Sequence, residues 1–326
     1  MKTSIVALAA VLAVALVAGP ATAGKSGKSG KSQKSEKSTK SQKRGQLQLR
    51  IEALEEALAN IGPEQTVFNV DCAAGDTITA ALAVANSGAT INVSGSCNEN
   101  VTLGKDAQKL IGVPGTGAGV VGTGGNTIVT VGRNTRIIGL NISGGADAII
   151  VSRGGSTRII DNVISGVTDR CITVTRHSYA DITDNDISSC SNDAVIIRNG
   201  SSADIHLNNI HDNGDDGVVI SGSSSADLDG NTITNNVRRG VALFRGSALN
   251  ISGDPTVPSV DRPNTITNNG DRGILCSQGG GLRVSQNQTV TGNSTDPSFG
   301  GRTGTNREVG LFNSCTTSNV GGVTFP

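Results

Sequence analysis

The amino-acid sequence predicts an all-β fold, a right-handed parallel β-helix solenoid with about 23 residues per coil. The first observation is a repeated Asn-x-Ile pattern whose asparagines recur at one constant interval, at Asn162, Asn185, Asn208 and Asn231. The second is a short apolar run that follows each repeat and is bounded by Gly, Asn, Asp and Ser. Strands this short at a common phase pair most simply with their own copies in the next coil, as a parallel ladder. The third is composition: with 44 Gly, 5 Phe, 1 Tyr and no Trp, the core must consist of thin Ile, Val and Leu layers.

Residues 1–23 have the pattern of a secretory signal peptide. Lys2 supplies the positive charge, an apolar run extends from Ile5 to Ala18, and Ala21-Thr22-Ala23 is a small-residue cleavage site. No later stretch reaches the roughly 20 apolar residues that a transmembrane helix needs. We therefore expect a secreted protein, periplasmic or extracellular, without a transmembrane segment.

Residues 24–44 form a Lys-Ser-x tract with a lysine at every third position. Because the tract has nothing apolar to bury, we expect a disordered cationic tether. It would serve as a solvated spacer or attach to an anionic cell-surface polymer. From Thr66 onward the balance reverses, with 17 basic against 22 acidic residues.

Residues 45–62 contain Leu47, Ile51, Leu54, Leu58 and Ile61, which is a heptad spacing. The segment predicts a short helix. Two heptads leave two roles open, an oligomerising stub that would make a homo-oligomer through residues 47–61, or a helix that packs on the end of the next domain.

The β-helix domain is expected over residues 66–326. Residues 76–86 read as a short amphipathic helix that starts near Asp76 or Thr77, and this helix would cap the exposed edge of the first coil. Farther along, three prolines between Asn250 and Asn264 mark an inserted loop (Pro255, Pro258 and Pro263). Insertions in solenoids often line the working face.

Two columns are predicted where the coils stack. Inward isoleucines recur at positions 142, 164, 187, 210, 233 and 266. The asparagine column sits at a tight turn, where Asn tolerates left-handed backbone conformations and bonds to its neighbours in a ladder.

The six cysteines of an exported chain suggest disulfides, and none of them forms a Cys-x-x-Cys motif. Their order along the chain favours pairing between neighbours. The expected pairs are Cys72–Cys97, Cys171–Cys190 and Cys276–Cys315.

The Asn-x-Ile repeat followed by Gly-Val-Val-Ile, as in Asn208 to Ile220, resembles the pectin lyase-like superfamily of bacterial parallel β-helix repeat proteins. The resemblance extends over about residues 70–325. It implies the fold but not one activity, since that superfamily includes polysaccharide lyases, hydrolases, uronate epimerases, spikes, adhesins and non-catalytic members.

The residues just before each second strand form two adjacent columns of charged side chains. Asp193, Asp215 and Asp216 are the best acid–base candidates, because like charges at coil spacing raise a carboxyl pKa. Arg170, Arg238 and Arg239 flank them and would neutralise a uronate carboxylate. The carboxylate trio of Asp193, Asp215 and Asp216 would hold Ca²⁺ if the protein were calcium-dependent, and no other cofactor is indicated. The structural alternative is charge compensation between stacked turns.

The motifs Ser191-Asn192-Asp193 and Gly214-Asp215-Asp216 are similar to the Asn-Thr-Asp and Asp-Asp motifs of polygalacturonase-type glycoside hydrolases. Those enzymes carry Gly-His-Gly and Arg-Ile-Lys on later coils. This sequence has Arg239-Gly240 and Arg272-Gly273-Ile274 at those places.

Three further residues are substrate-binding candidates together with Arg170. His211 lies shortly before Asp215, and Phe244 with Arg245 would border a groove. A basic stripe with interleaved aromatics is missing from the sequence, which argues against a nucleic-acid partner.

Three functions remain open. The leading hypothesis is a secreted protein that presents a repetitive polar face to polysaccharide, with weak catalysis or none. The second is a polysaccharide lyase, uronate epimerase or glycoside hydrolase that acts through the stacked Asp and Arg residues. The third is an oligomeric structural adhesin or spike.

Overall fold

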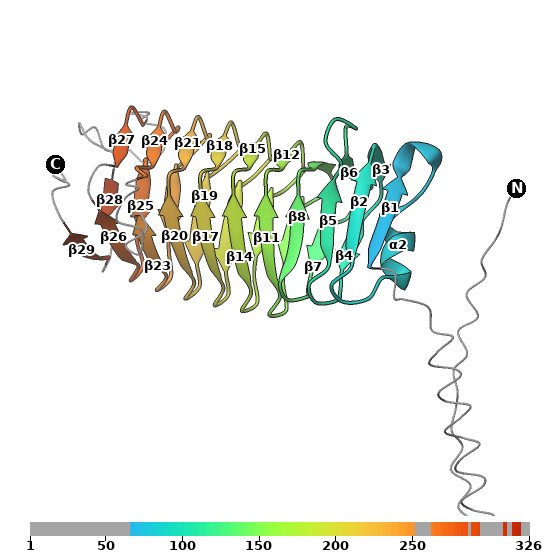
Figure 1. Ribbon diagram of the computed structural model, residues 1–326. Helices are drawn as coiled ribbons and strands as arrows, with labels where there is room; N and C mark the ends of the chain where they lie inside the picture. Colours follow the sequence, from blue (N-terminus) through green and yellow to red (C-terminus); the bar gives the residue numbers. More distant parts are fainter. Residues whose placement is uncertain (1–65, 252–261, 286–287, 294–308, 312–314, 321–326) are drawn as a thin grey trace, which may run out of the picture. The chain divides into compact units, whose positions relative to one another are not determined.

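The computed structural model describes residues 66–251, 262–285, 288–293, 309–311 and 315–320, all of which belong to the unit Glu64–Pro326. They form a right-handed parallel β-helix whose coils stack along one axis (Figure 1). The predicted signal peptide, tether and heptad helix lie outside the described residues, as does most of the proline-containing insertion. Within the described part of the chain, no helix has the length and apolar character needed to cross a membrane.

Three parallel sheets run along the stack, and each coil from β2 to β28 contributes one strand to each sheet, while β1 and β29 extend sheet A at its two ends. Sheet A contains β1 (Val67–Asp71), β2 (Thr90–Ser94), β5 (Lys109–Gly112), β8 (Thr135–Ile138), β11 (Ser156–Ile160), β14 (Tyr179–Thr183), β17 (Ser202–His206), β20 (Ser225–Asp229), β23 (Ala248–Ile251), β26 (Gly281–Ser285) and β29 (Thr316–Val320). Sheet B contains β3 (Ser96–Asn98), β6 (Gly119–Gly122), β9 (Asn141–Gly144), β12 (Val163–Ser165), β15 (Asp186–Ser188), β18 (Asn209–His211), β21 (Thr232–Thr234), β24 (Thr265–Thr267) and β27 (Thr289–Thr291). Sheet C contains β4 (Val101–Leu103), β7 (Ile128–Thr130), β10 (Ile149–Val151), β13 (Ile172–Val174), β16 (Val195–Arg198), β19 (Val218–Ser221), β22 (Val241–Leu243), β25 (Ile274–Cys276) and β28 (Val309–Leu311).

The strand register confirms the predicted phase of the repeat. In sheet B, Ile164 pairs with Ile187 and Ile187 with Ile210. The six predicted inward isoleucines are each at most 1% exposed. The core is therefore a stack of thin aliphatic layers, as the shortage of aromatic residues requires.

The predicted asparagine ladder runs along the corner between sheets A and B. The backbone N–H and the side-chain amide of Asn185 both donate to Asn208 Oδ1, each at 3.0 Å, and the same pair of bonds links Asn208 to Asn231. The expected left-handed backbone falls one residue earlier, at Asp184 and Leu207, with φ of 56° and 57°. The preceding residue makes the turn, and the buried Asn satisfies the polar groups that the turn exposes.

A second asparagine ladder, which the sequence analysis missed, runs along the corner between sheets B and C. Asn213, Asn236, Asn269 and Asn293 each accept bonds from the coil before. Serine hydroxyls form a third ladder between sheets C and A, as when the Ser178 N–H donates to Ser201 Oγ at 3.2 Å. All three corners thus carry side-chain hydrogen bonds from coil to coil.

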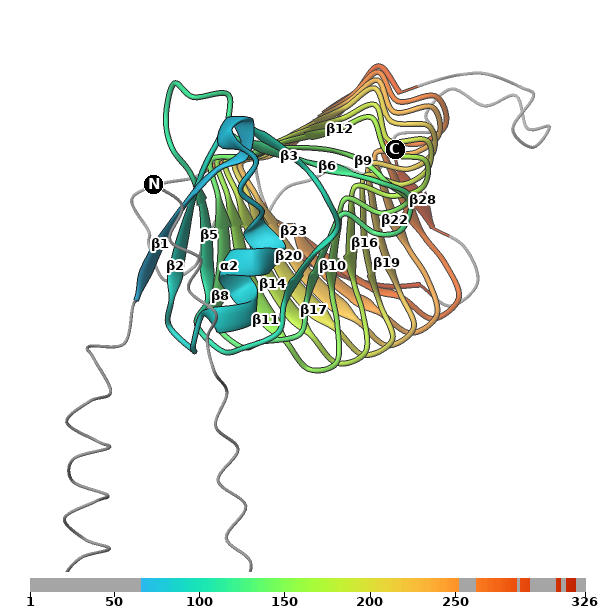
Figure 2. The same cartoon turned by 90° about the vertical axis from the view of Figure 1, so that its right-hand side faces the viewer.

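The N-terminal end of the stack is covered by the predicted cap helix, α2 (Ile78–Val84), which buries Ile78 and Leu82 (Figure 2). A short 3₁₀ turn, η1 (Cys72–Ala74), precedes it. Thr77 is the N-cap, as predicted, and its side chain accepts a bond from Ala80 N–H. Glu99 accepts bonds from the N–H groups of Ile78 and Thr79 at 2.7 and 2.9 Å. These contacts satisfy the first donors of the helix and fix it to the solenoid.

All three predicted disulfides are present, and no cysteine is left free. Their Cα–Cα distances are 5.1 Å for Cys72–Cys97, 5.7 Å for Cys171–Cys190 and 5.9 Å for Cys276–Cys315. The first joins η1 to β3 beside the cap. The second links the loop before β13 to the corner after β15.

Candidate functional site

The two predicted charged columns stand at the turn that enters each sheet C strand. Backbone bonds hold successive coils in register there: Ala194 N–H donates to Asp216 O at 3.0 Å and Gly217 N–H to Arg239 O at 2.8 Å. The structure therefore stacks Asp193, Asp216 and Arg239 on consecutive coils. Asp215 and Arg238 occupy the neighbouring column.

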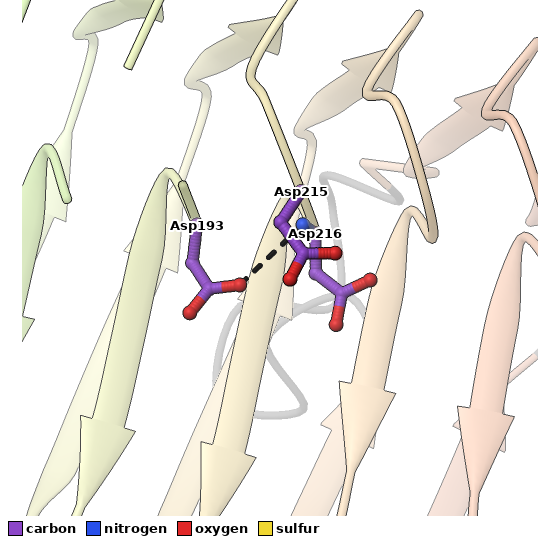
Figure 3. Close-up of side chains that lie close together, drawn as sticks. All are labelled: Asp193, Asp215 and Asp216. Carbon is purple, nitrogen blue, oxygen red and sulfur yellow. Dashed lines mark hydrogen bonds between the residues drawn. The ribbon is translucent and has the colours of Figure 1, made fainter. Parts of the chain in front are cut away.

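The three predicted carboxylates come together. One oxygen each from Asp193, Asp215 and Asp216 lies within 4.8 Å of the others (Figure 3). The dashed line in Figure 3 is a bond from the Asp216 N–H to Asp193 Oδ1, 3.4 Å long. The same bond recurs one coil on, where Arg239 N–H donates to Asp216 Oδ1 at 3.0 Å. The Asp column thus bonds to the backbone of the next coil.

An arginine pairs with each carboxylate of the trio. Arg170 Nε lies 3.3 Å from Asp193 Oδ2, and an Arg238 guanidinium nitrogen lies 3.5 Å from Asp215 Oδ1. An Arg239 guanidinium nitrogen lies 3.2 Å from Asp216 Oδ2. Arg170 also pairs with Asp169 and Arg239 with Asp271, so these two arginines are shared between carboxylates.

The three carboxylates of the trio differ in their exposure to solvent. Asp193 and Asp216 are buried, whereas the side chain of Asp215 is 33% exposed. Desolvation, with the Asp215 and Asp193 charges adding to it and Arg239 opposing it, raises the pKa of Asp216 to about 7. Burial and the Asp215 charge also raise the pKa of Asp193, against the opposing effect of Arg170. Asp216 therefore exchanges a proton near neutral pH, but Asp215 is the member that solvent reaches.

The donor set does not fit calcium. Calcium takes six to eight oxygen ligands, while both oxygens of Asp193 and of Asp216 already accept bonds from N–H groups. Arg170 and Arg239 would have to leave before the trio could coordinate an ion.

His211 belongs to a different cluster. It ends β18 on sheet B, and its two ring nitrogens contact Asp212 Oδ2 at 2.6 Å and Asp186 Oδ1 at 2.8 Å. Burial lowers the pKa of His211, but the bonds to Asp212 and Asp186 outweigh that effect and raise it. Both ring nitrogens of His211 are therefore already bonded to carboxylates.

Phe244 and Arg245 follow β22. Phe244 packs against Ile196, Val219 and Ala242, a small apolar cluster separate from the main core. The Arg239 guanidinium carbon lies 5.5 Å from the centre of the Phe244 ring. The ring therefore stabilises the buried arginine of the charged column.

A groove that the sequence analysis did not identify lies on the outer face of sheet C, with a volume of about 470 Å³. Its floor contains the outward residues of four successive strands (Thr102, Val129, Ile150 and Thr173), and its rim includes Arg153, Arg176 and Arg198. Phe244 and Arg245 do not line it. Among the described residues none of the three rim arginines pairs with a carboxylate, and Arg198 Nε is buried without a hydrogen-bond partner.

Arg153 and Arg176 occupy the same place in two successive coils, and Arg245 lies three coils farther on. All three have left-handed backbones, with φ of 59°, 59° and 53°. Arginine gains nothing locally from that conformation. The recurrence of Arg at the interval of the repeat was the sequence signal that could have identified this rim.

The comparison with protein families identifies the class. The family model described as "Right handed beta helix region" matches residues 118–289, just over half of the chain. The chain belongs to this right-handed β-helix family. No protein with a curated description matches this sequence significantly.

Solved structures align with this chain at low sequence identity. Pectate lyase Pel9A aligns with a TM-score of 0.56 and 12% identity, over 80% of this chain and 79% of that one. The A-module of Azotobacter vinelandii mannuronan C-5 epimerase AlgE4 aligns with a TM-score of 0.38 and 12% identity, over 79% of this chain and 95% of that one. Bacteriophage CBA120 tailspike protein 2 aligns with a TM-score of 0.41 and 11% identity, over 72% of this chain and 39% of that one. At 12% identity, the alignment with Pel9A shows the fold alone.

Proposed function

We propose that this chain is an exported protein that binds an anionic polysaccharide along the outer face of sheet C, and that it binds rather than turns over its ligand. The observation that carries the proposal is the groove rimmed by Arg153, Arg176 and Arg198, none of which pairs with a described carboxylate. Elsewhere on the solenoid, arginines such as Arg170 and Arg239 are already paired. The rim is therefore a place where three arginines stand around one groove without a described carboxylate partner.

The chemistry of the groove suits a carboxylated or sulfated sugar polymer. A guanidinium binds carboxylate or sulfate oxygens through two parallel N–H bonds. Thr102 offers an exposed hydroxyl on the floor, while Val129 and Ile150 offer apolar surface to a sugar ring. The Thr173 hydroxyl is buried and donates to Asp147 Oδ2 at 2.8 Å. Because the coils repeat at about 4.8 Å, a polymer along the axis meets equivalent positions at each step.

Export is supported by two features. Residues 1–23 have the composition of a signal peptide, and three disulfides pair all six cysteines. Disulfides persist in oxidising compartments. The lysine tract at residues 24–44 then offers a second attachment to an anionic cell-surface polymer.

The test is calorimetric titration of the full chain with polyuronate, sulfated and neutral polysaccharides at fixed ionic strength. We expect binding to the anionic polymers and a loss of about ten-fold or more in affinity for Arg153→Ala/Arg176→Ala, from two charge-assisted contacts. Arg136→Ala, an exposed arginine on sheet A, is the matched control. Equal affinity for neutral and anionic polymers, or an unchanged double variant, would refute this groove as the site.

A second candidate function, polysaccharide cleavage or epimerisation, rests on the trio. The pKa of Asp216 near 7 suits a group that exchanges protons at neutral pH, and Asp215 lies beside it with solvent access. Incubation of each polymer with the protein, followed by assays for unsaturated and reducing ends, tests this function. Products that disappear with Asp215→Asn would establish an enzyme and replace the binding proposal.

A further inference from the structure

A line of charged side chains runs along the outer face of sheet A, at one equivalent position on six successive coils. We call it the charged strip. It consists of Lys109, Arg136, Arg158, Asp181, Asp204 and Asp227, which the strand register places side by side. Three positive side chains are followed by three negative ones.

The strip is accessible and largely uncompensated within the chain. Arg136, Arg158 and Asp227 are exposed, and the other three are partly exposed. Only the two residues at the sign change form an ion pair within the strip, Arg158 Nε to Asp181 Oδ2 at 3.2 Å. Like charges in register on neighbouring strands repel one another. Both halves of the strip therefore favour a partner of opposite charge.

The order of charges makes the strip complementary to itself. Consider a second copy whose sheet A faces sheet A of the first, related by a two-fold axis that runs parallel to the strands between β11 and β14. In this arrangement the coils of the second copy run in the opposite order. Arg158 then faces Asp181 of the second copy, Arg136 faces Asp204, and Lys109 faces Asp227. This is an isologous contact in which each pair occurs twice. At about 4.8 Å per coil, the strip is about 24 Å long.

The centre of the strip also offers a hollow. A cavity of about 320 Å³ is lined by Ser156, Arg158, Tyr179 and their neighbours. Tyr179 is the only tyrosine of the chain and is 37% exposed. Under the same two-fold axis, Tyr179 of one copy faces Ser156 of the other, at the edge of this hollow. The Tyr179 hydroxyl donates to Asp204 Oδ2 at 2.6 Å, which fixes the ring at the surface. Tyrosines that become buried on association are frequent anchors of protein interfaces.

We propose that the charged strip is a self-association surface, on which a second copy of this chain packs antiparallel, sheet A against sheet A. The occupant is a second copy because the six charges match their own reversed order. This contact leaves the outer face of sheet C free. It is independent of the binding function proposed above and of the heptad segment at residues 47–61.

The experiment is sedimentation velocity of the full chain at low and high salt. We expect a dimer at about 20 mM NaCl that dissociates at about 500 mM, because salt screens exposed charge pairs. Arg136→Glu and Asp204→Arg should each weaken association by about ten-fold or more, since each change creates two like-charge contacts. Their combination in one chain restores opposite charges, so the double variant should recover the dimer. An equimolar mixture of the two single variants should form a heterodimer.

Matched controls make the outcomes distinct. Arg176→Glu changes the net charge by the same amount on the sheet C side and should leave association unchanged, although it should weaken polysaccharide binding. Leu54→Lys in the heptad segment should also leave association unchanged. The proposal is overturned by a monomer at low salt, by a double variant that stays monomeric while folded by circular dichroism, or by association that depends on Leu54 and not on Arg136.

Discussion

Arg239 bonds to Asp216 through both its backbone and its side chain. Its N–H donates to Oδ1 at 3.0 Å, and its guanidinium donates to Oδ2 of the same carboxylate at 3.2 Å. The guanidinium Nε also reaches Asp271 Oδ2 at 3.4 Å on the following coil. One buried arginine thereby ties three coils together, although its burial beside two carboxylates adds little net stability.

This relationship predicts a pH dependence of folding. The pKa of Asp216 is about 7 in the folded chain, against a reference value of 3.8. Between these values the folded state binds the proton more tightly, so the contribution of Asp216 to stability is fully present below about pH 4 and is lost as the pH rises to about 7. The loss is at most about 4 kcal/mol.

Asp216→Asn should remove this slope while keeping an oxygen that accepts the Arg239 N–H. Urea unfolding of both proteins between about pH 4 and 8, followed by circular dichroism, measures it. Asp227→Asn, an exposed carboxylate, serves as the control. A slope that persists unchanged in Asp216→Asn would show that another group titrates there.

The raised pKa of His211 predicts a second pH range, above that of Asp216, in which stability falls as the pH rises. Its pKa is raised above 6.5 because Asp212 and Asp186 stabilise the imidazolium. This stabilisation is present below about pH 6.5 and is lost as the pH rises through the folded pKa. His211→Gln should therefore lower stability at pH 6 by about 1 kcal/mol or less, since the cluster is partly exposed.

Thermal unfolding at pH 6 and pH 9 measures the His211 effect. The difference from the wild-type chain should shrink at pH 9. His177→Asn, an exposed histidine, should show no such change. An equal loss at both pH values would mean that His211 acts by packing and not by charge.

Replacement of Asn208, an uncharged residue of the first asparagine ladder, should lower the free energy of unfolding strongly. It is buried, and its Oδ1 accepts bonds from both the N–H and the amide of Asn185. Asn208→Ala leaves the buried Asn185 N–H without its acceptor and removes the amide bonds that Asn208 donates to Ile182 O and His206 O, which should cost about 3 kcal/mol or more. Its exposed neighbour supplies the control, since Asn209→Ala should change the unfolding free energy by less than about 0.5 kcal/mol. Similar losses for the two variants would contradict the ladder.

Calcium should not stabilise the folded chain. The oxygens of Asp193 and Asp216 already accept N–H bonds, so addition of Ca²⁺ or of a chelator should leave the melting temperature unchanged. Differential scanning fluorimetry checks this. A calcium-dependent rise that disappears in Asp215→Asn would assign the trio as a metal site.

Much of the fold could be predicted because the same stabilising contacts recur in each coil. Asn185, Asn208 and Asn231 occupy the same place in successive coils, and their constant spacing is visible in the chain. The second ladder was missed because Asn213 and Asn236 stand among turn residues, where Asn is common without burial. The disulfides followed from proximity along the sequence, since each links segments less than two coils apart.

The candidate site was only partly predictable. Stacking of Asp193 on Asp216 follows from the repeat, but the depth of burial depends on side chains of other coils, such as Arg239 and Phe244. Arg153 and Arg176 looked like ordinary surface residues in the sequence. Their recurrence at the interval of the repeat was a weak signal, and the sheet C groove, which forms from four strands at once, gives it meaning.

The hydrogen-bonded asparagines have a consequence for how such a chain changes over time. Each coil offers its successor the same contacts that it received from its predecessor. A duplication or loss of one whole period would therefore leave the remaining joints intact, and extra residues are accommodated in a loop, as between Asn231 and Asn264. A shift of a few residues within the strands and corners would instead remove their contacts with the next coil. The number of coils can therefore change in evolution more easily than the alignment of strands between neighbouring coils. The length of the solenoid can vary while its cross-section stays constant.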